Sequence, residues 1–118
     1  MDRRARLLEG ITREQRGIEV APWHNPIAPK CQGYDVLVLD VFDTATLQAR
    51  AAADPNIPPA DAARIEAVDL VGSAVEIAQL AEAHGAAPGG FDYILSSHNF
   101  EHLPDPVRFL QGCARLLR

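Results

Sequence analysis

Apolar residues recur along the chain in two patterns, one typical of amphipathic helices and one typical of buried strands. Residues 3–15 carry leucine and isoleucine at helical spacing among arginine and glutamate, which predicts a short amphipathic helix ended by Gly17. The apolar run 18–21 predicts a strand. Three prolines follow this run within eight residues, so we expect a rigid, non-helical loop after the first strand.

The segment 34–41 is a nearly continuous run of leucine and β-branched residues, typical of a parallel strand that is covered on both faces. Either Asp43 or Thr44 can cap a following helix, which we expect to end near Ala53. The proline-rich residues 54–60 then predict an exposed loop.

Residues 65–71 alternate between polar and apolar side chains, which predicts a third strand. Ser73 and Glu76 form a capping-box pattern, and we expect the helix that they open to run to about His84.

Residues 91–97 predict a fourth strand. Asp105 followed by Pro106 is typical of a helix start and predicts a last helix. The residues that we expect to line one apolar face of this helix are Val107, Leu110, Ala114 and Leu117.

The alternation of strands and helices predicts a Rossmann-like three-layer α/β sandwich with a mostly parallel sheet of about four strands. We expect residues 1–118 to form a single, partial domain, since no strand follows the last helix to close the sheet. An exposed edge of such a sheet favours association, so a homo-oligomer formed through that edge is an expectation as well.

Composition supports one globular domain. Hydrophobic residues make up 47% and charged residues 23% of the 118 residues, which is ordinary for a chain with a buried core. The formal net charge of −5 argues against a nucleic-acid partner. No apolar run is long enough to cross a bilayer and no secretory signal is visible, so we expect a cytoplasmic protein without a membrane partner.

Five of the 11 basic residues lie in the first 16 positions, namely Arg3, Arg4, Arg6, Arg13 and Arg16. We interpret them as the solvated face of a terminal helix, with a basic docking arm as the alternative. Cys31 and Cys113 lack the spacing of a metal or redox pair, and we expect two free thiols, with Cys113 in the core.

Open parallel sheets bind ligands at the carboxyl ends of their strands, and Asp40 stands at the end of the second predicted strand. An acid there can accept hydrogen bonds from both hydroxyls of a ribose, and Asp40 follows Glu19 by 21 positions, a separation typical of nucleoside cofactor sites. The alternative role is a loop aspartate that caps the next helix. No glycine-rich phosphate-binding loop is present, so the expected ligand carries a nucleoside without a phosphate chain.

Residues 98–102 read HNFEH, which matches the inverted zinc-protease pattern. That pattern requires both histidines on one helical face, whereas HNFEH follows a predicted strand and runs directly into LPDP, so we expect no metal site. We expect this stretch to form a pocket wall in which His98 serves as a base or a hydrogen-bond donor. A hydrogen-bonded corner between strand and helix is the alternative.

The run FDYILSSHNFEHLPDPVRFLQGCARLLR, residues 91–118, resembles the fourth strand and following helix of class I S-adenosylmethionine-dependent methyltransferases. GIEVAPWHNPIAPK is similar to the first motif of a subgroup of this family, and VLVLDV fits its second motif. The resemblance implies S-adenosylmethionine as cofactor. It also implies that the chain, which ends before the family's proline-glycine turn, lacks the last three strands.

Carried over to this chain, the resemblance implies cofactor-binding roles for seven residues. Glu19 and the backbone of Ala21 would border the methionine part of the cofactor, and Asp40 would hold its ribose. Asp69 and either Gly72 or Ser73 would border the adenine. Ser97 and the catalytic candidate His98 would lie near the sulfonium and the acceptor. Ala21 replaces the glycine that the family usually has there, which narrows the room for the cofactor.

The predicted function is therefore methyl transfer from S-adenosylmethionine to an unidentified acceptor, with small-molecule and glycan-type acceptors both open. The transfer is an in-line displacement that depends on alignment, and His98 is the candidate base if the acceptor must lose a proton. The alternative is a non-catalytic module of the same fold that binds the cofactor or only pairs with another chain.

Overall fold

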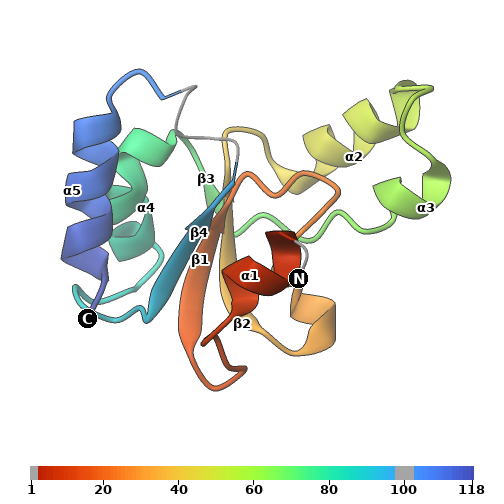
Figure 1. The fold of residues 1–118 in the computed structure, drawn as a ribbon. Coiled ribbons are helices and arrows are strands. Elements are labelled where there is room, and N and C mark those ends of the chain that lie inside the picture. Colours follow the sequence, from red (N-terminus) through yellow and green to blue (C-terminus); the bar gives the residue numbers. More distant parts are fainter. Residues whose placement is uncertain (1–2, 98–102) are drawn as a thin grey trace.

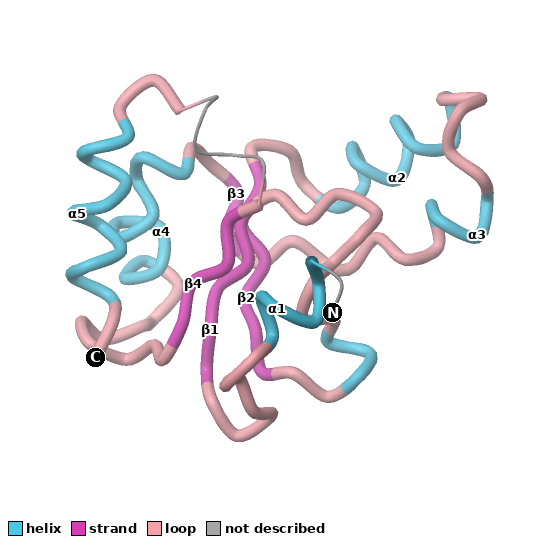
Figure 2. Tube along the Cα trace, in the orientation of Figure 1, coloured by secondary structure: helices cyan, strands magenta, loops and turns pink. Residues whose placement is uncertain are grey.

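A four-stranded, all-parallel sheet forms the centre of the protein in a computed structural model, which describes residues 3–97 and 103–118 (Figure 1). The strands are β1 (Arg16–Val20), β2 (Asp35–Asp40), β3 (Leu70–Val71) and β4 (Tyr93–Ser96), arranged in the order β3-β2-β1-β4. Figure 2 shows the four strands side by side between two groups of helices. This arrangement confirms the predicted Rossmann-like sandwich.

Helices cover both faces of the sheet. They are α1 (Arg3–Leu8), α2 (Thr44–Ala53), α3 (Pro59–Ala62), α4 (Ile77–Ala83) and α5 (Pro106–Leu116), with 3-10 turns η1 (Lys30–Gln32) and η2 (Ala74–Glu76). Helices α4 and α5 pack on one face, while α1 and the loop that follows β1 lie on the other (Figure 1). Helices α2 and α3 pack together beyond the carboxyl end of β2, around buried Leu47, Ala51 and Ile65.

Side chains that alternate along the strands build the two sides of the core. Ile18 and Val20 of β1 point toward α4 and α5, where Phe91 and Leu116 are fully buried. The opposite face carries Tyr93 and Leu95 of β4, which pack against Ile27 and Ala28 of the loop after β1. The loop after β1 therefore forms part of the layer that covers this face of the sheet.

The first helix is shorter than predicted. It ends at Leu8, and Gly10 follows with a φ of +82°, a left-handed conformation that glycine adopts readily and that stops a helix. Gly17 was predicted to end this helix and instead lies inside β1. The expected helix end was wrong because Gly10 already supplies it.

The N-terminal arginines are only partly the solvated face that was predicted. Arg6 is exposed, but Arg4 donates through Nε to the carbonyl of Ile27 at 3.1 Å. Arg13 donates to the carbonyl of Gln32 at 2.7 Å and stacks on Tyr34. These two side chains fasten the N-terminal segment to the loop after β1.

The third strand has two ladder residues in place of the predicted seven. Leu70 and Val71 pair with β2, whereas residues 65–69 are held mainly by side-chain hydrogen bonds. The helix after it starts as the 3-10 turn η2, with Ser73 Oγ accepting from the N–H of Val75 at 3.4 Å. Pro59 also opens the short α3, which begins within the segment 54–60 that was predicted to be irregular.

Helix α5 has its predicted Asp105 cap but buries a different face from the one predicted. Phe109, Cys113 and Leu116 are buried, while Val107 and Leu110 are exposed. Both sets of residues fit helical spacing, and the bulk of Phe109 against α4 decides between them. Cys113 is buried and Cys31 exposed, and both thiols are free as expected. In the described parts of the chain no helix is long and apolar enough to cross a membrane.

Gly17 is required by the ring of Tyr93, which lies directly over it in the register of β1 and β4. A methyl group at Gly17 would overlap the Cε2 edge of that ring. We therefore expect Gly17→Ala to lower the free energy of unfolding by about 1–3 kcal/mol in urea denaturation. The cost should shrink in a Tyr93→Ala background, and an equal cost in both backgrounds would show that the ring is not the obstacle.

Candidate functional site

The carboxyl ends of the strands meet at one edge of the sheet, and two cavities open there. The chain runs outward from β1 to β2 and β3 and returns to β4 on the other side of β1. Ligands of open parallel sheets bind at the carboxyl ends of such strands, where the strand order reverses. The two cavities share Ala21 and Trp23, which follow β1.

The larger cavity has a volume of about 620 Å³ and lies beyond the ends of β1 and β2. Its lining combines apolar, aromatic and charged side chains: Ala21, Trp23, Asp40, Phe42, Leu47, Arg50, Ala53, Asp54 and Pro55. Such a mixture of apolar walls and a few polar groups is typical of small-molecule sites.

Asp40 lies at the end of β2, where the sequence places it, and it is among the residues that line the larger cavity. The residue is 7% exposed, and Oδ1 accepts a hydrogen bond from the N–H of Phe42 at 3.1 Å. Burial raises the pKa of Asp40, and hydrogen bonds from Phe42 and Val41 oppose the rise. Asp43 caps α2 with its own carboxylate, so Asp40 is not needed for that role.

The smaller cavity has a volume of about 310 Å³ and lies where the strand order reverses, between β1 and β4. The residues that line it are Arg4, Leu7, Glu19, Val20, Ala21, Pro22, Trp23, Asn25, Ile27 and Ser97. Three predicted residues, Glu19, Ala21 and Ser97, therefore lie in the lining of one cavity.

Glu19 is a buried carboxylate that holds the loop after β1. Its two oxygens accept from the N–H groups of Ile27 at 2.8 Å and Ala28 at 3.1 Å. Burial raises the pKa of Glu19, while these two hydrogen bonds and the nearby Arg4 oppose the rise. The predicted contact with a cofactor and the observed clamp on the loop are compatible, because each carboxylate oxygen accepts more than one hydrogen bond.

The turn after β1 has an unusual backbone. Ala21 has a φ of +48° and Trp23 a φ of +56°, both in the left-handed region that favours glycine. The N–H of Ala21 is held by the carbonyl of Leu39 at 2.7 Å. The position where the family usually has glycine is therefore one where glycine is conformationally preferred.

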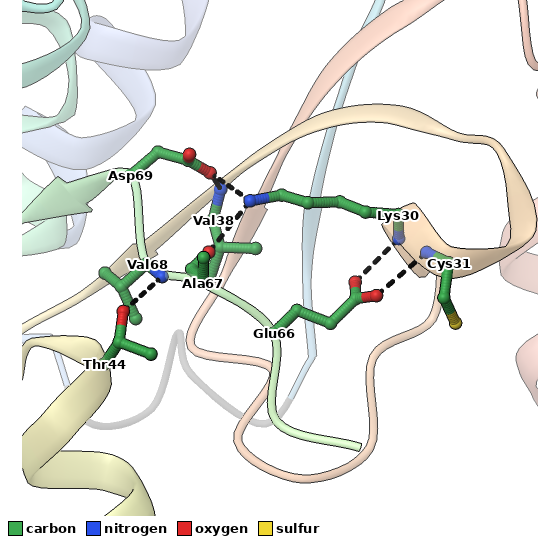
Figure 3. Close-up of polar contacts among 8 residues, drawn as sticks. All are labelled: Lys30, Cys31, Val38, Thr44, Glu66, Ala67, Val68 and Asp69. Carbon is green, nitrogen blue, oxygen red and sulfur yellow. Dashed lines mark hydrogen bonds and ion pairs between the residues drawn. The ribbon is translucent and has the colours of Figure 1, made fainter. Parts of the chain in front are cut away.

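Asp69 lies before β3, and neither it, Gly72 nor Ser73 is among the described residues that line the two cavities. Asp69 Oδ2 accepts from Lys30 Nζ at 2.6 Å and from the N–H of Val38 at 2.8 Å (Figure 3). The adenine contacts expected of these three residues stay predictions. The N–H of Gly72 donates to the carbonyl of Asp40 at 2.9 Å.

The segment 66–69 is tied to the loop after β1 by further polar contacts. Glu66 accepts from the N–H groups of Lys30 at 2.6 Å and Cys31 at 2.9 Å, and Lys30 Nζ donates to the carbonyl of Ala67 (Figure 3). Thr44 at the start of α2 accepts from the N–H of Val68 at 2.9 Å. These contacts connect the loop after β1 with the segments that precede β3 and follow β2.

The catalytic candidate His98 and the rest of HNFEH lie outside the described residues. Among the residues that the structure does describe, no group of three or more histidine, cysteine, aspartate or glutamate side chains is placed to hold a metal ion.

Sequence reasoning missed several residues of the larger cavity. Phe42, Leu47 and Arg50 all line it, and the guanidinium of Arg50 lies 4.0 Å from the centre of the Phe42 ring. Phe42 lies in the turn after Asp40, and Leu47 and Arg50 lie on α2, which follows that turn. Their closeness in sequence to the predicted ribose acid was the available signal.

A sequence profile for the methyltransferase domain matches residues 23–118. A ubiquinone biosynthesis O-methyltransferase of Pectobacterium carotovorum subsp. carotovorum (strain PC1) is 32% identical over 66 residues, which are 55% of this chain and 28% of that protein. The protein of the same description from Vibrio cholerae serotype O1 (strain ATCC 39541 / Classical Ogawa 395 / O395) is 33% identical over 66 residues, 55% of this chain and 27% of its own length.

The chain thus aligns with little more than a quarter of the length of these relatives. No solved structure matches it significantly. The profile nevertheless covers most of the sequence, including the three strands β2, β3 and β4 and the turn that carries Trp23. The chain therefore belongs to the methyltransferase domain family, as the resemblance to class I S-adenosylmethionine-dependent methyltransferases predicts.

Proposed function

We propose that this chain binds S-adenosylmethionine at the carboxyl edge of its sheet and transfers the methyl group to an acceptor. The observation that carries the proposal is the buried carboxylate of Asp40 at the end of β2, in the lining of the larger cavity. An acid in this position of a parallel sheet accepts hydrogen bonds from ribose hydroxyls.

The residues of the larger cavity fit the nucleoside part of this cofactor. Asp40 retains acceptor capacity beyond its bond to Phe42, because an ionised carboxylate offers about four lone pairs. Trp23, Phe42 and Leu47 supply apolar walls against which a base can pack. The second cavity continues past Ala21 toward Ser97, where the predicted reaction centre lies.

When bound, the cofactor supplies an activated methyl group on a sulfonium, so no covalent nucleophile of the protein is needed. The chain's own contribution is to bind the cofactor and the acceptor and to align them for the transfer. Asp40 holds one end of the ligand, the turn at Ala21 sets how closely the backbone approaches it, and Glu19 fixes the loop that closes the smaller cavity.

We further propose a small-molecule or glycan-type acceptor that is methylated on oxygen. The relatives' description as O-methyltransferases supports oxygen. A hydroxyl acceptor must lose a proton, and His98 is the residue proposed to take it. The direct experiment is an assay for S-adenosylhomocysteine release with a panel of hydroxylated acceptors, in which a His98→Gln variant should bind cofactor normally but turn over slowly.

A second candidate function is a module that associates with another copy of the chain without turnover. Among the described strands β4 pairs with β1 alone, which leaves it at the edge of the sheet. Exposed edges of this kind favour strand pairing between chains. Sedimentation that reports a dimer, together with no methyl transfer to any acceptor in the panel, supports this candidate over the first.

Asp40→Asn should weaken binding of S-adenosylhomocysteine about tenfold, the effect of losing one charge-assisted hydrogen bond. Asp43→Asn is the matched control, because Asp43 caps α2 from an exposed position and asparagine caps a helix equally well. Calorimetric titration of both variants checks the prediction. Equal affinities in the two variants would contradict the role of Asp40.

Binding should also weaken as the pH falls, and at a higher pH than an ordinary aspartate would cause. Burial raises the pKa of Asp40, so its carboxylate takes up a proton sooner on acidification, and the protonated form is a poorer acceptor for ribose hydroxyls. Titrations across the acidic range should show this loss in the wild type and a flatter profile in Asp40→Asn. If the affinities of the wild type and of Asp40→Asn fall in parallel with pH, the loss of affinity arises from the titration of another group.

Ala21→Gly should stabilise the fold by about 0.5–1 kcal/mol, because alanine at a φ of +48° is strained and glycine is not. The substitution also removes a methyl group from the lining of both cavities, so S-adenosylhomocysteine should bind as tightly as before or more tightly. Thermal unfolding and calorimetry measure the two effects. A loss of stability in Ala21→Gly would contradict the claim that the backbone is strained at this turn.

A further inference from the structure

Trp23 is an aromatic residue at the boundary between the two cavities. Ala21 and Trp23 are the two described residues that line both of them. The indole is half-buried and packs against the cluster of Leu47, Ala51 and Ile65 beyond β2. A ligand that extends from the larger cavity into the smaller one must therefore pass Trp23.

The backbone holds Trp23 in a conformation that is unusual for a bulky residue. Its φ is +56°, in the left-handed region that favours glycine. The N–H of Asn25 donates to the carbonyl of Pro22 at 3.1 Å, which closes a turn around Trp23 and His24. Residues strained in this way cluster at ligand-binding sites, so the conformation points to a role for the indole in binding.

The ring of Trp23 has a surface to offer to a cation. In the larger cavity the ring of Phe42 already carries the guanidinium of Arg50, at 4.0 Å from its centre. Among the described residues no arginine or lysine lies over Trp23 in this way, and its ring neighbour is His24, with 5.6 Å between the ring centres. Indole is the side chain whose ring face attracts cations most strongly. Trp23 therefore suits a positively charged group of a ligand.

The charges around Trp23 also favour a cation. The two buried charged side chains of the described chain are carboxylates, Glu19 in the lining of the smaller cavity and Asp40 in that of the larger one. The arginines of the two linings are engaged elsewhere, Arg4 by the carbonyl of a loop residue and Arg50 by an aromatic ring. A cation between the cavities is attracted by a carboxylate on each side.

We propose that the indole face of Trp23 binds the sulfonium group of S-adenosylmethionine. This inference rests on the proposed function, which places the nucleoside in the larger cavity beside Asp40 and the reaction centre near Ser97. The sulfur joins these two parts of the cofactor, so it lies at the boundary that Trp23 lines. A sulfonium is a compact cation of the same kind as the quaternary ammonium groups that aromatic side chains recognise.

The interaction distinguishes the cofactor before transfer from the product after it. As the acceptor oxygen forms its bond to the methyl carbon, the electron pair of the broken C–S bond stays on sulfur, and the acceptor's proton passes to the proposed base His98. The product sulfur is a neutral thioether, which the indole face does not attract as a cation. Trp23 should therefore strengthen the binding of S-adenosylmethionine more than that of S-adenosylhomocysteine, an effect measured in the ratio of the two dissociation constants.

The first experiment changes the electron density of the ring with little change in its shape. Trp23 is the one tryptophan of the sequence, so growth on mono-, di- or trifluorinated tryptophan alters this ring alone. Each fluorine withdraws electron density from the ring face and weakens its attraction for a cation. In calorimetric titrations the affinity for S-adenosylmethionine should fall stepwise, about fivefold in the trifluorinated protein, while that for S-adenosylhomocysteine changes less than about twofold. An affinity for S-adenosylmethionine that does not follow the number of fluorines would overturn the proposal.

Substitutions test the same claim independently. Trp23→Leu keeps an apolar wall without a ring and should weaken S-adenosylmethionine relative to S-adenosylhomocysteine about fivefold, and Trp23→Phe should fall between it and the wild type. Phe42→Leu is the matched control, because that ring already carries Arg50, and it should leave the ratio of the two dissociation constants unchanged. Thermal unfolding of each variant is followed in parallel. If Trp23→Leu does not fold, the fluorinated proteins still decide the question.

Two further results separate this inference from the proposed function. If both compounds bind the wild type and Trp23→Leu weakens them equally, Trp23 is an apolar wall only, and the inference fails while the proposed function stands. If neither compound binds the folded wild type, the proposed function fails and the inference fails with it.

Discussion

The buried carboxylate of Glu19 is the interaction on which the rest of the site depends. It sits on the face of β1 opposite α4 and α5 and accepts two backbone N–H groups, from Ile27 and Ala28. Hydrogen bonds to a charged group stabilise by about 1.5–3 kcal/mol, enough to offset part of the cost of burying the charge. The clamp turns the segment after β1 into a wall that covers β4 and borders the smaller cavity.

The same loop connects the parts of the molecule that the site requires. Arg4 and Arg13 attach the N-terminal segment to it, and Lys30 and Cys31 attach it to Glu66 and the residues before β3. Its first residues, Ala21 and Trp23, adopt left-handed conformations and line both cavities. Backbone strain at a binding site persists only where the surroundings hold it in place, and the bond from Ala21 to Leu39 does so here.

The sequence predicts the sheet and its central acid well because these depend on local patterns. The apolar run of β2, the Asp43 cap of α2 and the Asp105 cap of α5 are each visible in a few neighbouring residues. The parallel order of strands follows from their alternation with helices. Asp40 lies where the pattern places it, at the end of β2 and in a cavity.

The features that could not be predicted arise from contacts distant in sequence. The ring of Tyr93 leaves no room for a side chain at Gly17, and α4 packs on one of the two apolar faces of α5. Asp69 accepts hydrogen bonds from Lys30 and from the N–H of Val38, and Arg4 reaches Ile27 across 23 positions. None of these pairs has a local signature, because each forms only when the layers pack.

The central claim is that the ligand binds at the carboxyl edge of the sheet, and an NMR titration of ¹⁵N-labelled protein with S-adenosylhomocysteine tests it directly. The account predicts the largest amide shifts in three segments, at residues 21 and 23 after β1, at 40–42 where β2 ends and at 96–97 where β4 ends. The amides at the opposite edge, such as those of Asp35 and Asp92, should be unaffected. Saturable shifts confined to that opposite edge, or none from folded protein, would contradict the account.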